Sequence, residues 1–223
     1  DLFAGEVHSI LGENGAGKTT LLKAVLSLIP SEGEIIYSGE KIKDTAKVFS
    51  YIPQLSTAEG ICCLDFAAMG KTPFLPVFSH PSEKDRQKAS ELIDELIKED
   101  VKGRMITEIS GGQLKLLYIA RALMQNTPYL LCDEPCTGLD YNNKRMVYEM
   151  LGGLKDKGII ITEHDPQAAL HYADRIIILD CGRVVSDIKK DEFINKAEAE
   201  LGKIYSDIRI ENVHGELIVL RGK

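Results

Sequence analysis

The residues from Gly12 to Thr19 follow the pattern Gly-x-x-x-x-Gly-Lys-Ser/Thr. Loops of this pattern hold phosphate groups, because successive backbone N–H groups at a helix start point at the anion and the glycines let the backbone come close. The Lys18 ammonium would reach the terminal phosphates, and the Thr19 hydroxyl is a hard oxygen ligand for Mg²⁺. The stretch therefore predicts a site for a nucleoside triphosphate and Mg²⁺.

Two acidic residues end a later apolar run, PYLLCDEP. Asp133 and Glu134 are expected at the carboxyl end of a buried strand, where α/β sheets place their ligands. Asp133 is suited to the shell of the metal ion, and Glu134 could act as a general base on the attacking water. The apolar residues before the acids and Pro135 after them argue against a solvated turn.

A second glycine-bearing helix start is ISGGQ, at residues 109–113. It has the hydroxyl of Ser110 and two glycines but no lysine, so we expect a second phosphate contact there. His164 comes just after the apolar run GIIIT, and its place at a strand end favours a role in the site over a purely structural one. The remaining histidines have no such placement and are predicted to be structural: His8, His80, His171 and His214.

The elements that must position these side chains form an alternating pattern. EVHSIL predicts a strand before the phosphate loop, and a helix from about Lys18 to Leu28 should end before Pro30. KVFSYIPQ predicts a further strand that ends at Pro53. PYLLCDEP, GIIITEH and DRIIILDCGRVV are each interpreted as buried strands. Apolar runs separated by helical stretches indicate an α/β fold with a mostly parallel sheet covered on both faces.

Residues 61–113 lack the strand-like apolar runs of the flanking segments and predict an inserted helical subdomain. Ser82 and Asp85 form a capping pair, and the helix that they begin carries an apolar stripe of Ala89, Leu92, Ile93, Leu96 and Ile97. Ser110 is expected to cap a second helix, from Gly111 to Met124, with Leu116, Ala120 and Leu123 facing inward.

The domain boundaries follow from this pattern. Residues 1–60 and 114–190 are predicted to form the nucleotide-binding core, and residues 191–223 a C-terminal extension. The extension should contain a helix from about Asp191 to Tyr205 and a hairpin around His214 and Gly215. A short hairpin is also expected around Ser38 and Gly39.

Composition limits the possible partners. The 223-residue chain has a net charge of −7, so nucleic acid is not an expected partner. No apolar run approaches the roughly 18 residues that span a bilayer, and no signal-peptide pattern opens the sequence. Five cysteines without a C-x-x-C pair favour reduced thiols over disulfides or a zinc site.

Six segments, in this order, resemble the ATP-binding-cassette (ABC) ATPases: GENGAGKTT, YIPQ, ISGGQ, YLLCDEP, TGLD and TEHD. The resemblance covers essentially the whole chain, and six ordered motifs are more specific than any one of them. It implies a P-loop NTPase fold of the ABC-ATPase type that hydrolyses ATP with Mg²⁺.

The resemblance also implies a role for each matching residue. The cradle around ATP, called Walker A, would be formed by Gly12, Asn14, Gly15, Ala16, Gly17, Lys18, Thr19 and Thr20. Gln54 would contact Mg²⁺ and the water, with Thr19 and Asp133 as further metal ligands. Glu134 would be the catalytic base, and His164 would contact the γ-phosphate.

Other residues would act between two copies of the chain, arranged head to tail as a homodimer. The signature motif would clamp the γ-phosphate bound to the other copy; it comprises Ser110, Gly111, Gly112 and Gln113. Asp140 would lie at the dimer seam. The resemblance further implies a transmembrane permease as partner, an indirect link to a solute-binding protein, and a place on the cytoplasmic face of the cell membrane.

The sequence departs from the family pattern in several places. Ile109 replaces the usual Leu, Cys136 stands where Thr or Ser is usual, and residues 114–116, Leu-Lys-Leu, stand where Arg-Gln-Arg is common. The aromatic residue that stacks on adenine in the family lies upstream of Walker A. We expect it before the start of this sequence.

Three branches of the family compete. The segment between Gln54 and Ser110 is too short for the long coiled coil of chromosome-maintenance ATPases, and translation factors carry two cassettes. The remaining interpretation is the separate ATPase subunit of an importer. MGKTPFLPVFSHPSEKDRQKA, AALHYADRIIILDCGRVV and the tail resemble importers of iron-siderophores, haem and cobalamin. Alternatives are an ATPase for molybdate or another metal, an exporter, and a nucleotide-binding regulatory module without hydrolysis.

Overall fold

A computed structural model describes residues 2–54 and 60–221 of the chain. Within them a six-stranded sheet has the order β4-β5-β6-β1-β7-β8. The strands are β1 (Val7–Leu11), β4 (Phe49–Ile52), β5 (Tyr129–Asp133), β6 (Gly158–Glu163), β7 (Arg175–Asp180) and β8 (Arg183–Lys189). The first five in the sheet order pair in parallel, which confirms the mostly parallel α/β core.

One strand prediction was wrong. DRIIILDCGRVV does not form a single buried strand but the antiparallel pair β7 and β8, and most of β8 is exposed. Cys181 and Gly182 have φ angles of 45° and 75°, so the chain reverses there. Two consecutive residues with positive φ are typical of a tight hairpin turn. Apolar residues flank the turn on both sides, so the sequence pattern did not indicate it.

Three helices accompany the sheet: α1 (Lys18–Val25), α5 (Tyr141–Gly153) and α6 (Pro166–Tyr172). Helix α1 ends earlier than predicted, because Ser27 adopts a φ of 56°. The Leu28 N–H then donates to the Lys23 carbonyl and closes the helix end. Each of these helices follows a strand of the core, as the alternating pattern requires.

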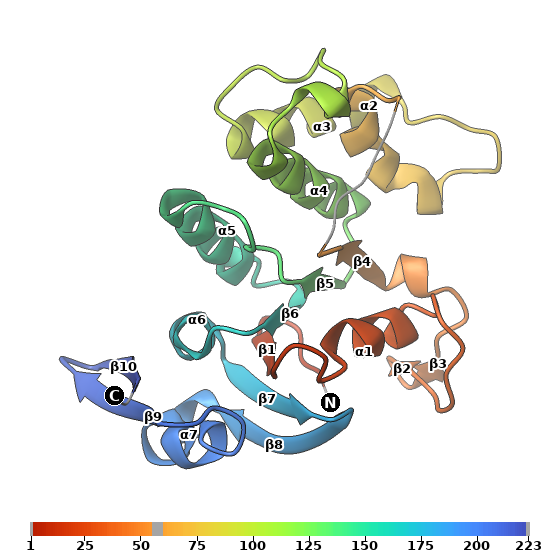
Figure 1. The fold of residues 1–223 in the computed structure, drawn as a ribbon. Coiled ribbons are helices and arrows are strands. Elements are labelled where there is room, and N and C mark those ends of the chain that lie inside the picture. The colour runs from red at the N-terminus through yellow and green to blue at the C-terminus, as the bar shows by residue number, and fades with distance from the viewer. Residues whose placement is uncertain (1, 55–59, 222–223) are drawn as a thin grey trace.

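A separate group of helices forms a lobe above the sheet in Figure 1. It contains α2 (Cys63–Ala68), the 3₁₀ segment η2 (Met69–Phe74), α3 (Glu83–Leu96), the 3₁₀ segment η3 (Ile106–Glu108) and α4 (Gly111–Gln125). The Ser82–Asp85 capping box is present, and Ala89, Ile93 and Leu96 are buried. We call this group the helical lobe. In α4, Leu116 and Ala120 are buried as predicted, whereas Leu123 is only half-buried.

The chain ends with helix α7 (Phe193–Leu201) and an antiparallel hairpin of β9 (Ile208–Val213) and β10 (Glu216–Arg221). Helix α7 is shorter than predicted at both ends: the 3₁₀ segment η4 (Lys190–Glu192) precedes it, and it ends at Leu201. The hairpin turn lies at the predicted residues, where φ is 54° at His214 and 93° at Gly215.

Two shorter elements complete the architecture. The small hairpin around Ser38 pairs β2 (Ile36–Tyr37) with β3 (Glu40–Lys41), and the 3₁₀ segment η1 (Thr45–Lys47) leads into β4. Across residues 2–54 and 60–221, no helix combines the length and hydropathy that crossing a membrane requires.

Candidate nucleotide site

The loop between β1 and α1 forms a cradle that depends on its glycines. Gly15 and Gly17 have φ angles of 86° and 102°, in the left-handed region that favours glycine. A Cβ atom on Gly12 would collide with the Leu179 carbonyl oxygen. The loop therefore brings its backbone closer to the neighbouring β7 strand than a side chain would allow.

Lys18 lies inside this cradle. Its side chain is buried, with 6% of the residue exposed, and Nζ donates to the carbonyl oxygens of Gly12 at 2.7 Å and Glu13 at 3.1 Å. The ammonium is thus held at the N-terminus of α1. A cation at this position, next to free helix N–H groups, favours a bound phosphate.

The other predicted cradle residues lie along the same loop and the first turn of α1. Asn14 and Thr20 are exposed, and Ala16 is buried. The Ala16 carbonyl oxygen accepts a hydrogen bond from the Gly182 N–H at 2.9 Å. The β7–β8 turn therefore supports the phosphate loop from behind.

Asp133 and Thr19 meet at the carboxyl end of β5. The Thr19 hydroxyl donates to Asp133 Oδ1 at 3.0 Å, although the two residues are far apart in the sequence. Thr162 donates to the same oxygen at 2.7 Å, and Tyr51 donates to Oδ2 at 3.3 Å. Burial and the neighbouring Asp133 carboxylate raise the pKa of the Tyr51 hydroxyl, so it remains a donor at neutral pH.

This pair fits a magnesium ion. A hydroxyl and a carboxylate are the hard oxygen ligands that Mg²⁺ prefers, and Mg²⁺ commonly takes its other ligands from substrate phosphates and water. Within residues 2–54 and 60–221, no group of three or more His, Cys, Asp or Glu side chains could hold a metal ion. The Thr19 hydroxyl and the Asp133 carboxylate fit a metal that takes its remaining ligands from a nucleotide and water.

Three side chains surround the Glu134 carboxylate, and two of them come from distant parts of the sequence. Its Oε2 atom accepts from Gln54 Nε2 at 2.9 Å and from the Thr137 hydroxyl at 3.1 Å, and His164 Nδ1 lies 3.9 Å away. The Glu134 backbone has a φ of 47° and its N–H donates to the Thr162 hydroxyl at 2.9 Å. The fold therefore gathers the three residues expected to be catalytic around one carboxylate oxygen.

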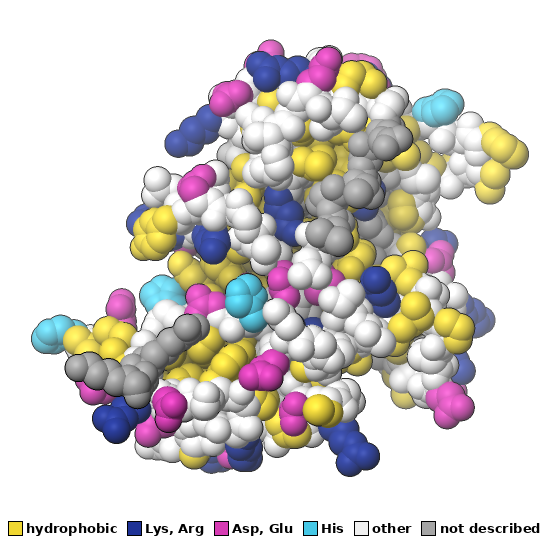
Figure 2. All heavy atoms as spheres, in the orientation of Figure 1, with side chains coloured by type: hydrophobic (Ala, Val, Ile, Leu, Met, Phe, Trp, Pro, Cys, Tyr) yellow, Lys and Arg dark blue, Asp and Glu magenta, His cyan; other side chains and the backbone are white. Residues whose placement is uncertain are grey.

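The surface around this region is hollowed. Figure 2 shows a recess between the helical lobe and the sheet, with acidic, basic and histidine side chains gathered near it. These groups suit hydrolysis of a phosphate anhydride. Lys18 and the metal-ligand pair can bind the phosphates, and the Glu134 carboxylate remains free to accept a proton from water.

The signature residues lie elsewhere, at the N-terminus of α4 in the helical lobe (Figure 1). The Ser110 hydroxyl accepts from the Gln113 N–H at 3.2 Å, and Gln113 Oε1 accepts from the Ser110 N–H at 2.9 Å. These two residues thus cap their own helix. Gly111 is exposed beside them and Gly112 is half-buried. The side-chain hydrogen bonds of Ser110 and Gln113 lie within this lobe, and the role of the motif toward another copy stays a prediction.

Asp140 has a local role in the structure. Its Oδ1 accepts from the Asn143 N–H at 3.0 Å and its Oδ2 from the Asn143 side chain at 2.6 Å, so it caps α5. These hydrogen bonds, led by the one from the Asn143 backbone, lower the pKa of its carboxyl group. The side chain is exposed, and its predicted place at a dimer seam stays a prediction.

Sequence reasoning missed several residues at the site. Tyr51 and Thr162 both donate to Asp133. The sequence signal for both was their position: Tyr51 stands three residues before Gln54, and Thr162 stands two residues before His164. Strand alternation then predicts that Thr162 points to the same side of the sheet as His164.

Glu163 was missed as well. It is buried beside Tyr148 of α5, whose hydroxyl donates to its carboxylate. Burial raises the pKa of the Glu163 carboxyl group, against the opposing effect of the Tyr148 hydrogen bond. An acid inside an apolar strand was the only signal for it in the sequence.

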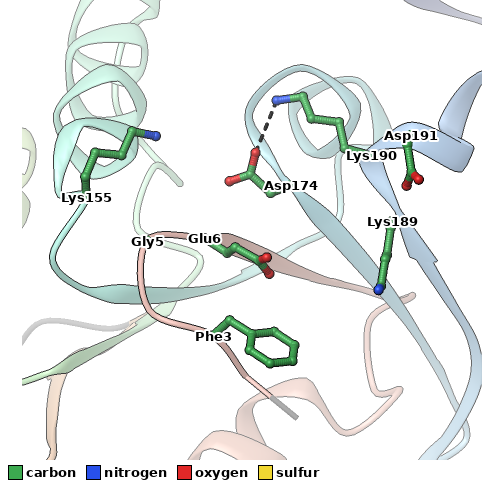
Figure 3. Close-up of a pocket in the computed structure, with 8 residues that line it drawn as sticks. All are labelled: Phe3, Gly5, Glu6, Lys155, Asp174, Lys189, Lys190 and Asp191. Atoms are coloured by element: carbon green, nitrogen blue, oxygen red, sulfur yellow. Dashed lines mark hydrogen bonds and ion pairs between the residues drawn. The ribbon is translucent and has the colours of Figure 1, made fainter.

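A second cavity, of about 420 Å³, lies at the opposite end of β1. Figure 3 shows Phe3, Gly5 and Glu6 on one side of it and Lys190, which bonds Asp174 at 3.3 Å, on the other. These residues lie before β1 and around β7 and β8, at the end of β1 away from the phosphate loop. This cavity is therefore separate from the nucleotide site.

Comparison with known proteins agrees with this geometry. The sequence profile of the family described as "ABC transporter" matches residues 1–137. The manganese transport system ATP-binding protein MntB of Listeria monocytogenes is 34% identical over 80% of this chain and 77% of its own. The zinc transport system ATP-binding protein TroB of Treponema pallidum is 32% identical over 86% and 76%. A protein of Helicobacter pylori named "Probable iron chelatin transport ATP-binding protein" is 34% identical over 78% and 72%.

Solved structures show the same fold. A metal-chelate type ABC transporter in an inward-facing conformation superimposes with a TM-score of 0.81 at 24% identity, over 98% of this chain and 86% of the other. A dimeric bacterial ABC transporter cassette gives a TM-score of 0.75 at 26% identity, over 85% and 88%. The family profile covers more than half of the chain and the relatives exceed 30% identity. The chain therefore belongs to the ABC transporter family: it contains the ATP-binding domain of that family and is an ATPase.

Proposed function

We propose that this chain is the ATP-hydrolysing subunit of a transporter that imports a transition metal, as an ion or as a chelate. The observation that carries the hydrolytic part is the convergence of Gln54 and His164 on the Glu134 carboxylate. This carboxylate lies next to Asp133, which bonds Thr19 of the phosphate loop.

In the proposed mechanism the loop N–H groups and Lys18 bind the β- and γ-phosphates. Thr19, Asp133 and Gln54 would hold Mg²⁺, and the bound ion would supply positive charge to offset that of the transferred phosphoryl group. Glu134 accepts a proton from the attacking water, and Gln54 orients that water. His164 donates a hydrogen bond to the γ-phosphate, which stabilises the charge that develops there.

The complete site needs a second copy of the chain. We propose that the signature residues of one copy, Ser110 to Gln113, close over the nucleotide held by the other copy, head to tail, with Asp140 at the seam. This arrangement is supported by the exposed start of α4 and by the likeness to a dimeric cassette. Hydrolysis would reopen the dimer.

The helical lobe is the proposed contact with a permease. It carries exposed apolar side chains, among them Phe74, Val77 and Phe78, the last 98% exposed. Closure of two such lobes would move the membrane domain. On this proposal the chain lies at the cytoplasmic face of the cell membrane. Residues 61–113 are proposed as the helical signature subdomain, distinct from the core (1–60, 114–190) and from the tail (191–223).

The cargo is proposed from the relatives. Proteins named for manganese, zinc and iron chelatin transport are all similar to this chain at 32–34% identity. They support a metal as the cargo class. The finer proposal, an iron-siderophore, haem or cobalamin complex, draws on the sequence resemblance in the segment from Met69 to Ala89. The competing proposal is a free manganese or zinc ion.

An uptake assay separates these cargoes. Cells that lack this chain would be supplied with wild type or with Lys18→Ala, and accumulation of labelled manganese, zinc, ferric siderophore and cobalamin would be followed. We expect restored uptake of one metal species by wild type only. Export of a metal, or equal accumulation with both proteins, would contradict the import proposal.

A further inference from the structure

Lys115 of α4 is a buried cation whose partners are backbone atoms. The residue is 5% exposed, and its Nζ donates to the carbonyl oxygens of Pro53 at 3.1 Å and Gln54 at 2.8 Å. These carbonyls belong to the segment that follows β4. One side chain thus joins the helical lobe to the end of a core strand.

Burying the Lys115 ammonium at this position costs free energy, because the charge loses its contact with water. Burial lowers the pKa of Lys115, although nearby acids led by Asp133 oppose the shift. Desolvating a buried charge costs free energy that offsets much of what its two hydrogen bonds contribute, so their net effect on stability is small. The main effect of the Lys115 hydrogen bonds is therefore to fix the position of the backbone that accepts them.

What they hold is the backbone of Gln54. The side chain of the same residue donates through Nε2 to Glu134 Oε2 at 2.9 Å. The distance from Gln54 to Glu134 therefore depends on where its peptide unit is anchored. Lys115 provides that anchor from one turn beyond Gly111, close to the exposed start of α4.

We infer that Lys115 is a positioning residue that links the signature end of α4 to Gln54. In a head-to-tail dimer, the signature serves the nucleotide of the other copy, whereas Gln54 serves the nucleotide of its own. Because a helix moves as a rigid unit, a displacement of the start of α4 would be passed by Lys115 to Gln54 and its contact with Glu134. One hydrogen-bonded side chain thus couples the two ATP sites. This inference rests on the proposed roles of Gln54 and Glu134.

The test compares Lys115→Met with a matched control on the same helix. Gln125 also bridges α4 to the β4 region, with Nε2 donating to the carbonyl oxygens of Ala46 at 2.6 Å and Phe49 at 3.1 Å. Gln125→Met removes an equivalent pair of hydrogen bonds away from Gln54. Lys115→Gln keeps N–H donors on a shorter side chain and serves as the conservative variant.

Each variant would be assayed for kcat, KM and Hill coefficient of Mg-ATP hydrolysis, for ATP affinity and for Tm. We expect Lys115→Met to lower kcat by about tenfold, the scale of losing hydrogen bonds to a charged group, and to bring the Hill coefficient towards one. ATP affinity should stay within about twofold and Tm should change little, since the relief of a buried charge offsets the two lost hydrogen bonds. Lys115→Gln should restore part of kcat. Gln125→Met should lower Tm and leave kcat within about twofold.

A double mutant separates this inference from the proposed role of Gln54. If Lys115 acts through Gln54, adding Lys115→Met to Gln54→Ala should lower kcat no further. Additive losses, an unchanged kcat in Lys115→Met, or an equal kcat loss in Gln125→Met would overturn the inference. An unchanged kcat in Gln54→Ala would instead overturn the proposed role of Gln54 itself.

Discussion

At the scale of single residues, the geometry around Glu134 differs from that of an ordinary strand end. The φ of 47° is unusual for a residue with a side chain and costs about 1 kcal/mol or more. The Thr162 hydroxyl holds the Glu134 N–H in that conformation. The strained backbone directs the carboxylate toward Gln54 and His164.

Glu134→Gln tests the proposed general base. The amide has nearly the shape of the carboxylate but cannot accept the proton, so kcat should fall by about 10² to 10⁴ while ATP stays bound. Steady-state hydrolysis and a nucleotide-binding titration measure the two effects. Glu149→Gln, which breaks an exposed ion pair with Arg145, is the control. A kcat within threefold of wild type would count against Glu134 as the base.

Lys18→Ala tests the phosphate cradle. Loss of a buried ammonium that contacts phosphate should weaken nucleotide binding by about 10- to 100-fold. A fluorescent ATP analogue titrated into the protein measures this. Lys23→Ala, an exposed lysine on the same helix, should leave the affinity unchanged. Equal affinities for Lys18→Ala and wild type would contradict the assignment.

The raised pKa of the buried Glu163 carboxyl group predicts that the stability of the fold depends on pH. Burial raises its pKa above the ordinary value of 4.5, so the folded chain binds this proton more readily than the unfolded chain. Stability from this group is therefore lost as pH rises from the unfolded value through the raised folded value. Glu163→Gln removes the ionisation and keeps an acceptor for Tyr148.

The Tm gain of Glu163→Gln over wild type should accordingly be larger at pH 7 than at pH 4. For a chain of this size each 1 kcal/mol corresponds to about 2–4 °C. Thermal melts at the two pH values measure the difference. A gain that is the same at both would show that the carboxyl group titrates alike in the folded and unfolded chain.

At the scale of elements, the helical lobe depends on one close approach. Gly70, in η2, faces α4, and a Cβ there would collide with the Arg121 carbonyl oxygen and lie 2.8 Å from Met124 Cβ. Gly70→Ala should therefore destabilise the chain by about 1–3 kcal/mol, the usual cost of overpacking. Denaturant unfolding checks this value. Gly103→Ala is the control in the same lobe, because its Cβ would meet nothing within 4 Å.

At the scale of the whole molecule, ATP should drive dimerisation. Glu134→Gln with Mg-ATP should double the molar mass in light scattering, and ADP should not. Gly111→Asp should prevent the dimer, because the new carboxylate would face the phosphates held by the partner.

The Gly111→Asp variant should still fold. The position has open space for a side chain, and an acid suits the first turn of α4. Gly103→Asp should dimerise like the parent protein. A monomer in all ATP-bound samples would contradict the head-to-tail proposal.

The sequence by itself determined the family, the parallel sheet, the helical lobe and the residues of the phosphate cradle. These follow from local signals: glycine spacing around Lys18, the Ser82–Asp85 cap, apolar periodicity and turn residues such as His214-Gly215. Each depends on residues that are neighbours along the chain. Where a turn was hidden between apolar stretches, at Cys181 and Gly182, the local signal failed.

Only the tertiary structure decided which side chains meet. The bonds of Thr19, Tyr51 and Thr162 to Asp133 join segments far apart in the sequence, as does the contact of Lys115 with Gln54. Such contacts depend on strand order, with β5 between β4 and β6, and on how α4 lies against β4. Strand order and packing arise from burial of the whole core, and periodicity along one segment carries no information about them.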